Sequence, residues 1–230
     1  MITKSIASVN NEINHFVSKA GLPDEVIEVI SRSIIAGQNG TVKGLKLGDT
    51  APDFTLIDVN GTAFNLYSKL EEGPVVVSFF RGSWCPFCSL ELQSLQKNLN
   101  DIQKMGASLV AILPQKLEAS RQLIDKYYLK FPLLSDENQQ CLEAFQVKYN
   151  LTQGIINIYR DSFGIDLTRL NANGTWNLPV PATFIIDVDR KVKARHFSHD
   201  YMIRMEPRDI LEALGNLPNT TEEIEYMRTI

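Results

Sequence analysis

The chain has 230 residues, 44% of them hydrophobic and 22% charged, which is the balance of an ordinary globular protein with a sizeable core. Its formal net charge is −4 and it carries no basic run, so neither nucleic acid nor an anionic membrane is expected as a partner. No stretch approaches the ~20 apolar residues of a membrane-spanning helix. The N-terminus lacks the apolar run of a signal peptide, and the three cysteines fit a reducing compartment, so we expect a cytoplasmic protein.

The N-terminal section is predicted to be helical. Apolar residues at helical spacing predict two short helices within residues 13–34, the second ending at Gly37. Residues 38–48 hold three glycines among mostly polar residues, which is typical of a linker. We therefore assign residues 1–47 to a helical N-terminal extension and linker.

The main domain is predicted over residues 48–215, where strands alternate with helices before a closing hairpin and helix. This order is that of the thioredoxin-like fold, an α/β architecture with a mixed central sheet and helices on both faces. Residues 150–180 are expected to form an irregular insertion, and residues 216–230 a C-terminal tail, predicted to be helical. The predicted strands are 51–58, 62–66, 74–80, 107–113, 131–134, 182–187 and 191–196, and the predicted helices are 85–104, 116–129, 136–149 and 207–215.

A cysteine pair follows the buried strand 74–80. Cys85 stands at the start of a helix, where unpaired backbone N–H groups and the macrodipole stabilise a thiolate, so its pKa should lie below the ~8.5 of a free cysteine. Cys88, one turn later, falls on the apolar face that is directed at the sheet. The geometry therefore predicts Cys85, at an exposed helix tip, as the attacking sulfur and Cys88 as its protected partner in an internal disulfide.

Other chemistry is open to the cysteines. The pair could be half of a zinc site with His196 and His199, although that histidine spacing is tighter than usual and the strand–Cys-x-x-Cys–helix context favours redox chemistry. We expect no metal. Cys141 lies among apolar residues of a predicted helix and is expected to pack in the core, with a role as a distant resolving cysteine as the alternative.

Several segments together resemble a known family. Arg-Gly-Ser-Trp-Cys-Pro-Phe-Cys at 81–88, Ala-Pro-Asp-Phe at 51–54 and Pro-Val-Pro-Ala-Thr-Phe at 179–184 are similar to the peroxiredoxin-like branch of the alkyl hydroperoxide reductase/thiol-specific antioxidant family. The likeness covers about residues 48–215. Residues 1–47 lie outside it.

The resemblance implies a thiol-dependent peroxidase. Cys85 would be the peroxidatic cysteine, which attacks the O–O bond of hydrogen peroxide or an organic hydroperoxide and becomes a sulfenic acid that Cys88 captures as a disulfide. A thioredoxin- or glutaredoxin-like protein would reduce that disulfide, without any cofactor. Thioredoxin-fold peroxidases often dimerise, which the apolar N-terminal helices could serve.

The chain departs from the family pattern at two places. The motif Pro-x-x-x-Thr/Ser-x-x-Cys is replaced, and Ser83 is the nearby hydroxyl that would substitute for its Thr/Ser. Pro181 stands where the family usually has its peroxide-orienting arginine, and it resembles the cis-proline of thioredoxins, which receives a substrate backbone. Arg81 is then the local guanidinium for stabilising a thiolate and a developing alkoxide, with a surface salt bridge as the alternative. Arg195 and Arg204 could also reach the site, but no sequence feature places them.

Trp84 and Phe87 are expected to shield the cysteine pair or to form part of a docking surface, with simple packing as the alternative.

Three functions follow from these residues. A peroxidase using Cys85 and Cys88 is the leading hypothesis. A thioredoxin-like thiol–disulfide oxidoreductase acting on protein disulfides is the first rival, favoured by the Trp-Cys-x-x-Cys motif and Pro181. A non-enzymatic redox sensor, with the N-terminal helices as its interaction surface, is the second.

Overall fold

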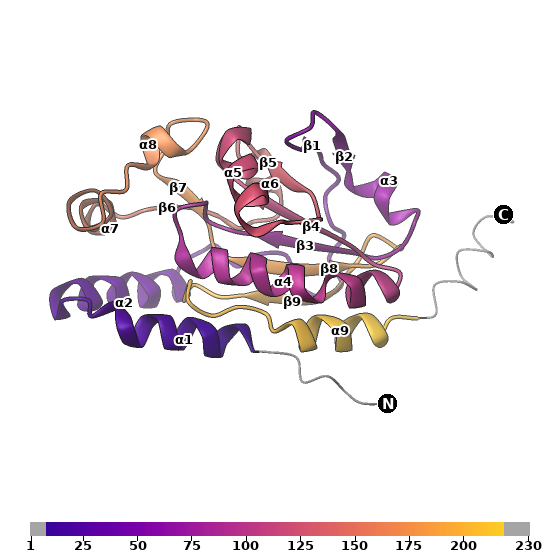
Figure 1. The fold of residues 1–230 in the computed structure, drawn as a ribbon, viewed down its shortest axis with the longest axis horizontal. Helices are drawn as coiled ribbons and strands as arrows, with labels where there is room; N and C mark the ends of the chain where they lie inside the picture. The colour runs from indigo at the N-terminus through magenta and orange to yellow at the C-terminus, as the bar shows by residue number, and fades with distance from the viewer. Residues whose placement is uncertain (1–7, 219–230) are drawn as a thin grey trace, which may run out of the picture.

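The computed structural model describes residues 8–218, apart from the side chains of residues 16–18. A seven-stranded mixed sheet forms its centre, in the order β2-β1-β5-β4-β3-β8-β9, with helices on both faces (Figure 1). Neighbouring strands β3, β4 and β5 are parallel, and the other pairs in the sheet are antiparallel. The predicted α/β, thioredoxin-like fold is confirmed.

The elements agree with most of the predicted ones. The strands of the sheet are β1 (Thr55–Ile57), β2 (Ala63–Asn65), β3 (Val75–Phe79), β4 (Ser108–Leu113), β5 (Leu133–Ser135), β8 (Ala182–Ile186) and β9 (Val192–Phe197). A separate ribbon pairs β6 (Lys148–Asn150) with β7 (Asn177–Pro179). The helices are α1 (Val9–Ala20), α2 (Asp24–Gln38), α3 (Leu66–Leu70), α4 (Pro86–Lys104), α5 (Leu117–Tyr127), α6 (Gln140–Ala144), α7 (Gln153–Asn157), the π-helix η1 (Ile158–Ser162), α8 (Leu167–Leu170) and α9 (Pro207–Gly215).

Strand β3 separates two apolar cores. Its side chains alternate between the faces of the sheet, so Val75, Val77 and Phe79 pack with α3 and α6, whereas Val76 packs with α4, α5 and α9. Every residue of β3 is buried, as expected for a central strand covered on both sides. The chain leaves this rigid strand directly into the segment that carries the two cysteines.

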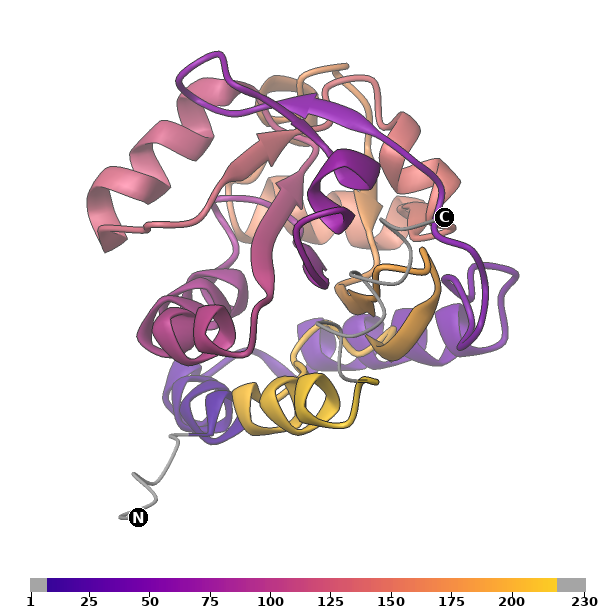
Figure 2. The same ribbon diagram turned by 90° about the vertical axis from the view of Figure 1, so that its right-hand side faces the viewer.

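The N-terminal helices lie against the sheet domain. Helix α1 runs beside α4, with α9 next to it on the same face of the sheet (Figures 1 and 2). Its first turn is fixed by the Glu206 carboxylate, which accepts hydrogen bonds from Ser8 Oγ at 2.7 Å and from the Val9 amide at 2.8 Å. The Asn10 side chain exchanges two 2.8 Å hydrogen bonds with the backbone N–H and C=O of Arg204.

The structure differs from the predicted elements in one main region. The helix predicted over 136–149 shortens to α6, because Gln146 adopts a positive φ of 56° and the chain turns into β6. Residues 150–180 are mostly ordered elements rather than an irregular insertion. Their apolar side chains, Ile155 and Tyr159 among them, form a third core with Val26 and Ile30 of α2.

Two segments remain, a short helix and the C-terminal tail. The short helix α3 was not predicted, since five residues are too few for a helical period to stand out. The helix predicted for the C-terminal tail lies outside the described residues. Within residues 8–218, no helix is both long and apolar enough to cross a membrane.

Candidate active site

Cys85 caps the N-terminus of α4 and Pro86 occupies its first turn. Gly82 makes the turn between β3 and this helix, and its carbonyl accepts a 3.2 Å hydrogen bond from the Cys85 amide. Gly82 has a φ of 152°, and a Cβ at this position would lie 2.6 Å from Trp84 Nε1 and 2.8 Å from Gln115 Oε1. The turn that presents Cys85 therefore requires glycine.

Both sulfurs are buried, which corrects the prediction of an exposed Cys85. Cys85 is 1% exposed and Cys88 is 0% exposed. The predicted inward face of α4 is observed, since Cys88 packs with Leu92 and Leu95 in the core beneath the sheet. Cys85 is covered because residues of α2 and of the η1 region lie over the helix start, which the sequence of α4 alone does not reveal.

The two thiols have opposite acidities. Burial opposes ionisation of Cys85, but a hydrogen bond from Cys88 and the charges of Arg81 and Arg204 outweigh it and lower the pKa of Cys85 to about 6. Burial, the hydrogen bond to Cys85 and the charge of Cys85 raise the pKa of Cys88 well above its usual value. At neutral pH, Cys85 is therefore a thiolate and Cys88 a thiol that donates to it.

Arg81 is a buried cation in an aromatic surround. Its side chain is 2% exposed, and its guanidinium carbon lies 4.0 Å from the ring centre of Tyr201, 5.1 Å from that of Trp84 and 5.4 Å from that of Tyr159. Among the described residues, its Nε and Nη2 atoms have no hydrogen-bond partner. Arg81 is thus not part of a surface salt bridge, two of its donor atoms are unused, and its charge lowers the pKa of Cys85.

A second buried arginine serves Cys88. Arg204 is 2% exposed, its Nη2 lies 3.6 Å from the Cys88 sulfur, and its Nε donates to Glu91 Oε2 at 2.6 Å. Its Nη1 donates to the backbone carbonyls of Tyr201 and Ile203. Burial raises the pKa of Glu91 to about 7, against the opposing charge of Arg204. Ser78 donates to the other carboxylate oxygen of Glu91 at 3.2 Å.

Cys85 borders a cavity of about 400 Å³. Apolar and aromatic side chains dominate its lining, and Arg81 supplies its charge. One wall belongs to the N-terminal section, from which Leu22, Ile27, Ile30 and Ile34 contribute. The opposite side is formed around the cysteine by Arg81, Trp84, Cys85, Pro86, Phe87, Tyr159, Phe163, Ile165, Tyr201 and Met202.

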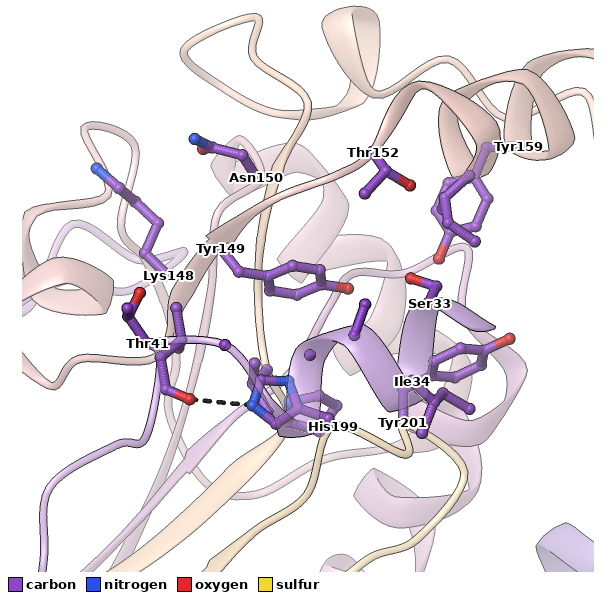
Figure 3. A pocket seen from close by; sticks show the side chains of 17 residues that line it. Ser33, Ile34, Thr41, Lys148, Tyr149, Asn150, Thr152, Tyr159, His199 and Tyr201 are labelled. Carbon is purple, nitrogen blue, oxygen red and sulfur yellow. Dashed lines mark hydrogen bonds between the residues drawn. The ribbon is translucent and has the colours of Figure 1, made fainter. Parts of the chain in front are cut away.

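A second cavity, of about 410 Å³, adjoins the first and shares Ile34, Tyr159 and Tyr201 with it (Figure 3). Pro181 lines this cavity. Within residues 8–218 every peptide bond is trans, including the one before Pro181, so the resemblance to a thioredoxin cis-proline does not extend to its geometry.

Of the other predicted site residues, some line the cavity beside Cys85 and others do not. Trp84 and Phe87 line the cavity beside Cys85, whereas the cavity lining within the described chain does not include Ser83. The Ser83 amide donates to Gln115 Oε1 at 2.6 Å, which supports the loop. Phe87 also packs against Tyr201, with ring centres 5.7 Å apart.

The residues for which zinc binding, a resolving role or a place at the site was considered make other contacts. Hydrogen bonds join His196 to the Ile203 carbonyl and His199 to the Val42 carbonyl. Cys141 is buried in the core on the α3 and α6 side of the sheet. Arg195 donates to the backbone carbonyls of Leu45 and Lys43 in the linker. Among the described residues, no group of three or more His, Cys, Asp and Glu could hold a metal ion.

Sequence reasoning missed Glu91, Tyr159 and Tyr201, and it could not choose between Arg195 and Arg204. One signal was available. Glu91 lies three residues after Cys88, on the buried side of α4, and a carboxylate there requires a buried partner. The two tyrosines carry no comparable signal, because they come from the η1 helix and the β9–α9 loop and are assembled only by the fold.

Comparisons with known proteins agree with this geometry. The AhpC/TSA family model matches residues 47–195. Peroxiredoxin Bcp of Escherichia coli K12 is 34% identical over 125 residues, covering 53% of this chain and 80% of its own. The chloroplastic peroxiredoxin Q of rice is 33% identical over 116 residues, covering 50% of this chain and 53% of its own.

Solved structures show the same fold. The crystal structure of peroxidoxin BcpB from Mycobacterium tuberculosis has a TM-score of 0.60 and 26% identity, and the similarity covers 76% of this chain and 99% of that one. Peroxiredoxin Q of Xanthomonas campestris has a TM-score of 0.57 at 19% identity, over 76% of this chain and 98% of its own. The chain therefore belongs to the AhpC/TSA family, as a thiol peroxidase homologous to the peroxiredoxins Bcp and Q.

Proposed function

We propose that Cys85 is the peroxidatic cysteine, that Cys88 resolves it to an intramolecular disulfide, and that organic hydroperoxides are the favoured substrates. The observation that carries this proposal is a thiolate with a pKa of about 6 at the edge of a mostly apolar cavity of about 400 Å³. A thiolate is the reactive form of cysteine, and an apolar cavity favours the organic part of a hydroperoxide over bulk water.

The first step consists of an attack along the O–O bond. The Cys85 sulfur forms an S–O bond with the terminal hydroxyl oxygen while the O–O bond breaks, so the thiolate is oxidised to a sulfenic acid. The other oxygen departs as an alkoxide, which takes a proton from water to become the alcohol. Arg81 lines the same cavity as Cys85, and its unused Nε and Nη2 donors are available to stabilise the departing alkoxide. Trp84 and Phe87 shield this step from water, because both line the cavity.

The second step forms the disulfide. Cys88 attacks the Cys85 sulfur, the S–S bond forms, the S–OH bond breaks, and the hydroxide leaves as water with the Cys88 proton. A helical turn separates the two residues, and their sulfurs are already hydrogen-bonded. Cys141 lies in the core on the other face of the sheet, so we assign it no part in the cycle.

Reductant, oligomeric state and location complete the proposal. A thioredoxin- or glutaredoxin-like dithiol protein would reduce the disulfide, in the cytoplasm, where cysteines remain reduced. A homodimer through α2 fits Ile27 and Ile35, which are 47% and 57% exposed. Light scattering of the reduced protein tests the dimer, and turnover with each candidate reductant tests the partner.

Stopped-flow reaction of the reduced protein with cumene hydroperoxide and with hydrogen peroxide tests the central proposal. We expect the wild type to react far faster than a free thiol, the Cys85→Ser variant to lose this reaction, and the Cys88→Ser variant to react once and stop at the sulfenic acid. A wild-type rate equal to that of a free thiol would overturn the proposal. Turnover of insulin disulfides in its place would favour the thiol–disulfide oxidoreductase.

A further inference from the structure

The charges of the two buried arginines act most strongly on different sulfurs. Of the two charges that stabilise the Cys85 thiolate, Arg81 contributes more than Arg204, whereas for Cys88 the order is reversed. Arg204 Nη2 lies 3.6 Å from the Cys88 sulfur, and Arg81 borders the peroxide cavity, which Arg204 does not among the described residues. Arg204 also lies beyond residues 47–195, the part of the chain that matches the family.

From this arrangement we propose that Arg204 is a catalytic residue of the resolving step, which stabilises the developing Cys88 thiolate, and that Glu91 is the positioning residue that holds Arg204 against the sulfur. The inference rests on the proposed role of Cys88 as the resolving cysteine. It assigns to Arg204 a step that is distinct from the one Arg81 serves.

The timing of the step follows from the contacts of Cys88. In the reduced protein its proton is retained by burial, by its hydrogen bond to the Cys85 thiolate and by the negative charge of that thiolate. Oxidation of Cys85 to a neutral sulfenic acid removes the charge and weakens that hydrogen bond. Arg204, whose Nη2 lies 3.6 Å from the Cys88 sulfur, then contributes more than Arg81 to favouring the anion of Cys88.

Cys88 is therefore protected as a thiol until its partner has reacted. When Cys88 attacks, its sulfur gains the S–S bond, the S–O bond of Cys85 breaks, and hydroxide and the Cys88 proton leave together as water. The step needs no additional oxidant, since the peroxide has already supplied the oxidation of Cys85.

Glu91 fixes the arginine in this geometry. Its carboxylate accepts a 2.6 Å hydrogen bond from Arg204 Nε, and its other oxygen accepts one from Ser78. The side chains of Glu91 and Arg204 are both buried. The remaining Arg204 donors are used by backbone carbonyls, which leaves Nη2 directed at the Cys88 sulfur. A guanidinium that is held by a carboxylate at Nε and by two carbonyls at Nη1 has little freedom to move away from the sulfur.

Single-turnover kinetics separates the two steps. The reduced protein is mixed with cumene hydroperoxide, peroxide loss reports the first step, and timed trapping with dimedone followed by mass spectrometry reports the lifetime of the sulfenic acid. We expect Arg204→Met to slow disulfide formation by between about tenfold and a hundredfold, the size of one lost hydrogen bond to a charged group. Peroxide loss should change by less than about threefold.

Two variants provide the matched comparison. Arg81→Met should show the opposite result, with slow peroxide loss and near-normal disulfide formation. Arg208→Met removes an exposed arginine whose nearby partner is Asp209, and it should leave both steps unchanged. A longer-lived sulfenic acid is also more easily oxidised further, so Arg204→Met should accumulate sulfinic acid at peroxide concentrations that wild type survives.

Other variants keep the test valid if Arg204→Met folds poorly. Arg204→Lys keeps the charge and should recover part of the resolving rate. The double variant Arg204→Met/Glu91→Gln removes both buried charges together, which proteins tolerate better than one unpaired charge, and it should still resolve slowly. Glu91→Gln alone should slow resolution less than Arg204→Met does, because the arginine remains.

An unchanged sulfenic-acid lifetime in folded Arg204→Met or in the double variant would overturn the inference. Equal slowing of both steps would overturn it as well, because Arg204 would then act through Cys85 or through the fold. Failure of the proposed function looks different. In that case wild type itself would consume peroxide no faster than a free thiol, or would consume it without forming the Cys85–Cys88 disulfide.

Discussion

The acidity of Cys85 reflects a competition at the scale of single residues. Burial disfavours the thiolate, whereas a donated S–H and two guanidinium groups favour it, and the favourable contacts are the larger set. Cys88 lies in the same core without becoming acidic, because its burial is reinforced by the hydrogen bond that it donates to Cys85 and by the negative charge of Cys85. Two chemically identical side chains thus differ because of their partners rather than their exposure.

This balance predicts a specific pH dependence. The thiolate is the deprotonated form, so the second-order rate with peroxide should rise with pH, reach half its maximum near pH 6 and level off above. Arg81→Met removes a charge that lowers the pKa of Cys85, so its midpoint should move upward by about one unit. Thiolate absorbance at 240 nm, followed from pH 4 to 10, measures both midpoints, and Arg208→Met should titrate like wild type. A wild-type midpoint near 8.5 would contradict the arrangement described here.

Gly82 is the residue on which the turn into α4 depends. Gly82→Ala would place a Cβ 2.6 Å from Trp84 Nε1 at a φ that side chains rarely adopt, so we expect about 1–3 kcal/mol of destabilisation. The shifted turn should also misplace Cys85 and slow its reaction with peroxide. Urea unfolding and stopped-flow kinetics measure the two effects. Gly164→Ala, also at positive φ but with no atom within 4 Å of the added Cβ, is the matched control and should leave the peroxide rate unchanged.

Sequence reasoning located Cys85, Cys88 and Arg81 because each carries a local signal, namely the strand–Cys-x-x-Cys–helix context and its adjacent guanidinium. It was wrong about the exposure of Cys85. Cys85 is covered by α2, which lies some fifty residues earlier in the chain. No local sequence pattern indicates that a distant helix will pack over the start of another. The partnership of Arg204 with Glu91 was hidden for the same reason, since 113 residues separate them.

At the scale of elements, α2 forms a wall of the cavity beside Cys85. Ile34 lines the cavity, whereas the adjacent Ile35 is 57% exposed and is absent from that lining in the described chain. We expect Ile34→Gln to lower kcat/KM for cumene hydroperoxide by about tenfold, because it places a polar amide against the organic part of the substrate. The value for hydrogen peroxide should change much less.

Ile35→Gln is the matched control in the same helix, and it should leave the ratio of the two kcat/KM values unchanged. Equal losses for both peroxides in Ile34→Gln would show that α2 supports the site without selecting the substrate. The comparison is therefore a ratio within one protein, which a general loss of stability cannot mimic.

The elements themselves were predictable to different degrees. The buried strand β3 and the long helix α4 show clear apolar periods, and their predicted bounds differ from the observed ones by no more than one residue. The elements of residues 136–180 were not predictable, because they are short helices and strands that are held in place by long-range contacts. A helix of five residues such as α6 or α7 has little period of its own, and its place depends on packing against α2 and the sheet.

At the scale of the whole molecule, the first turn of α1 is fastened near the start of α9. Asn10 satisfies the backbone N–H and C=O of Arg204, so Asn10→Ala should cost about 1–3 kcal/mol and loosen the helical pair. Because α2 covers Cys85, we also expect faster alkylation of Cys85 by a bulky maleimide. Quantified alkylation and limited proteolysis within residues 9–38 measure these effects.

The matched control removes a different polar contact of α1. Lys97→Ala removes an exposed ion pair between α4 and Glu12, which spans 3.4 Å, and such pairs contribute at most about 1 kcal/mol. It should leave the alkylation rate of Cys85 unchanged. If Asn10→Ala behaved like Lys97→Ala, the helical pair would be held by its other contacts, namely the hydrogen bonds to Glu206 and apolar packing.

The complete burial of the sulfur pair separates the two substrates of the enzyme by size. A hydroperoxide fits into a space of about 400 Å³, whereas the reduced Cys85 and Cys88 are at most 1% exposed, so the proposed dithiol protein could not reach a disulfide that kept this arrangement. With such a reductant, we expect each cycle to include an opening motion after the disulfide has formed. At saturating peroxide and reductant, we expect turnover to be limited by the frequency of this motion, with viscosity and temperature controlling the rate more strongly than the identity of the peroxide.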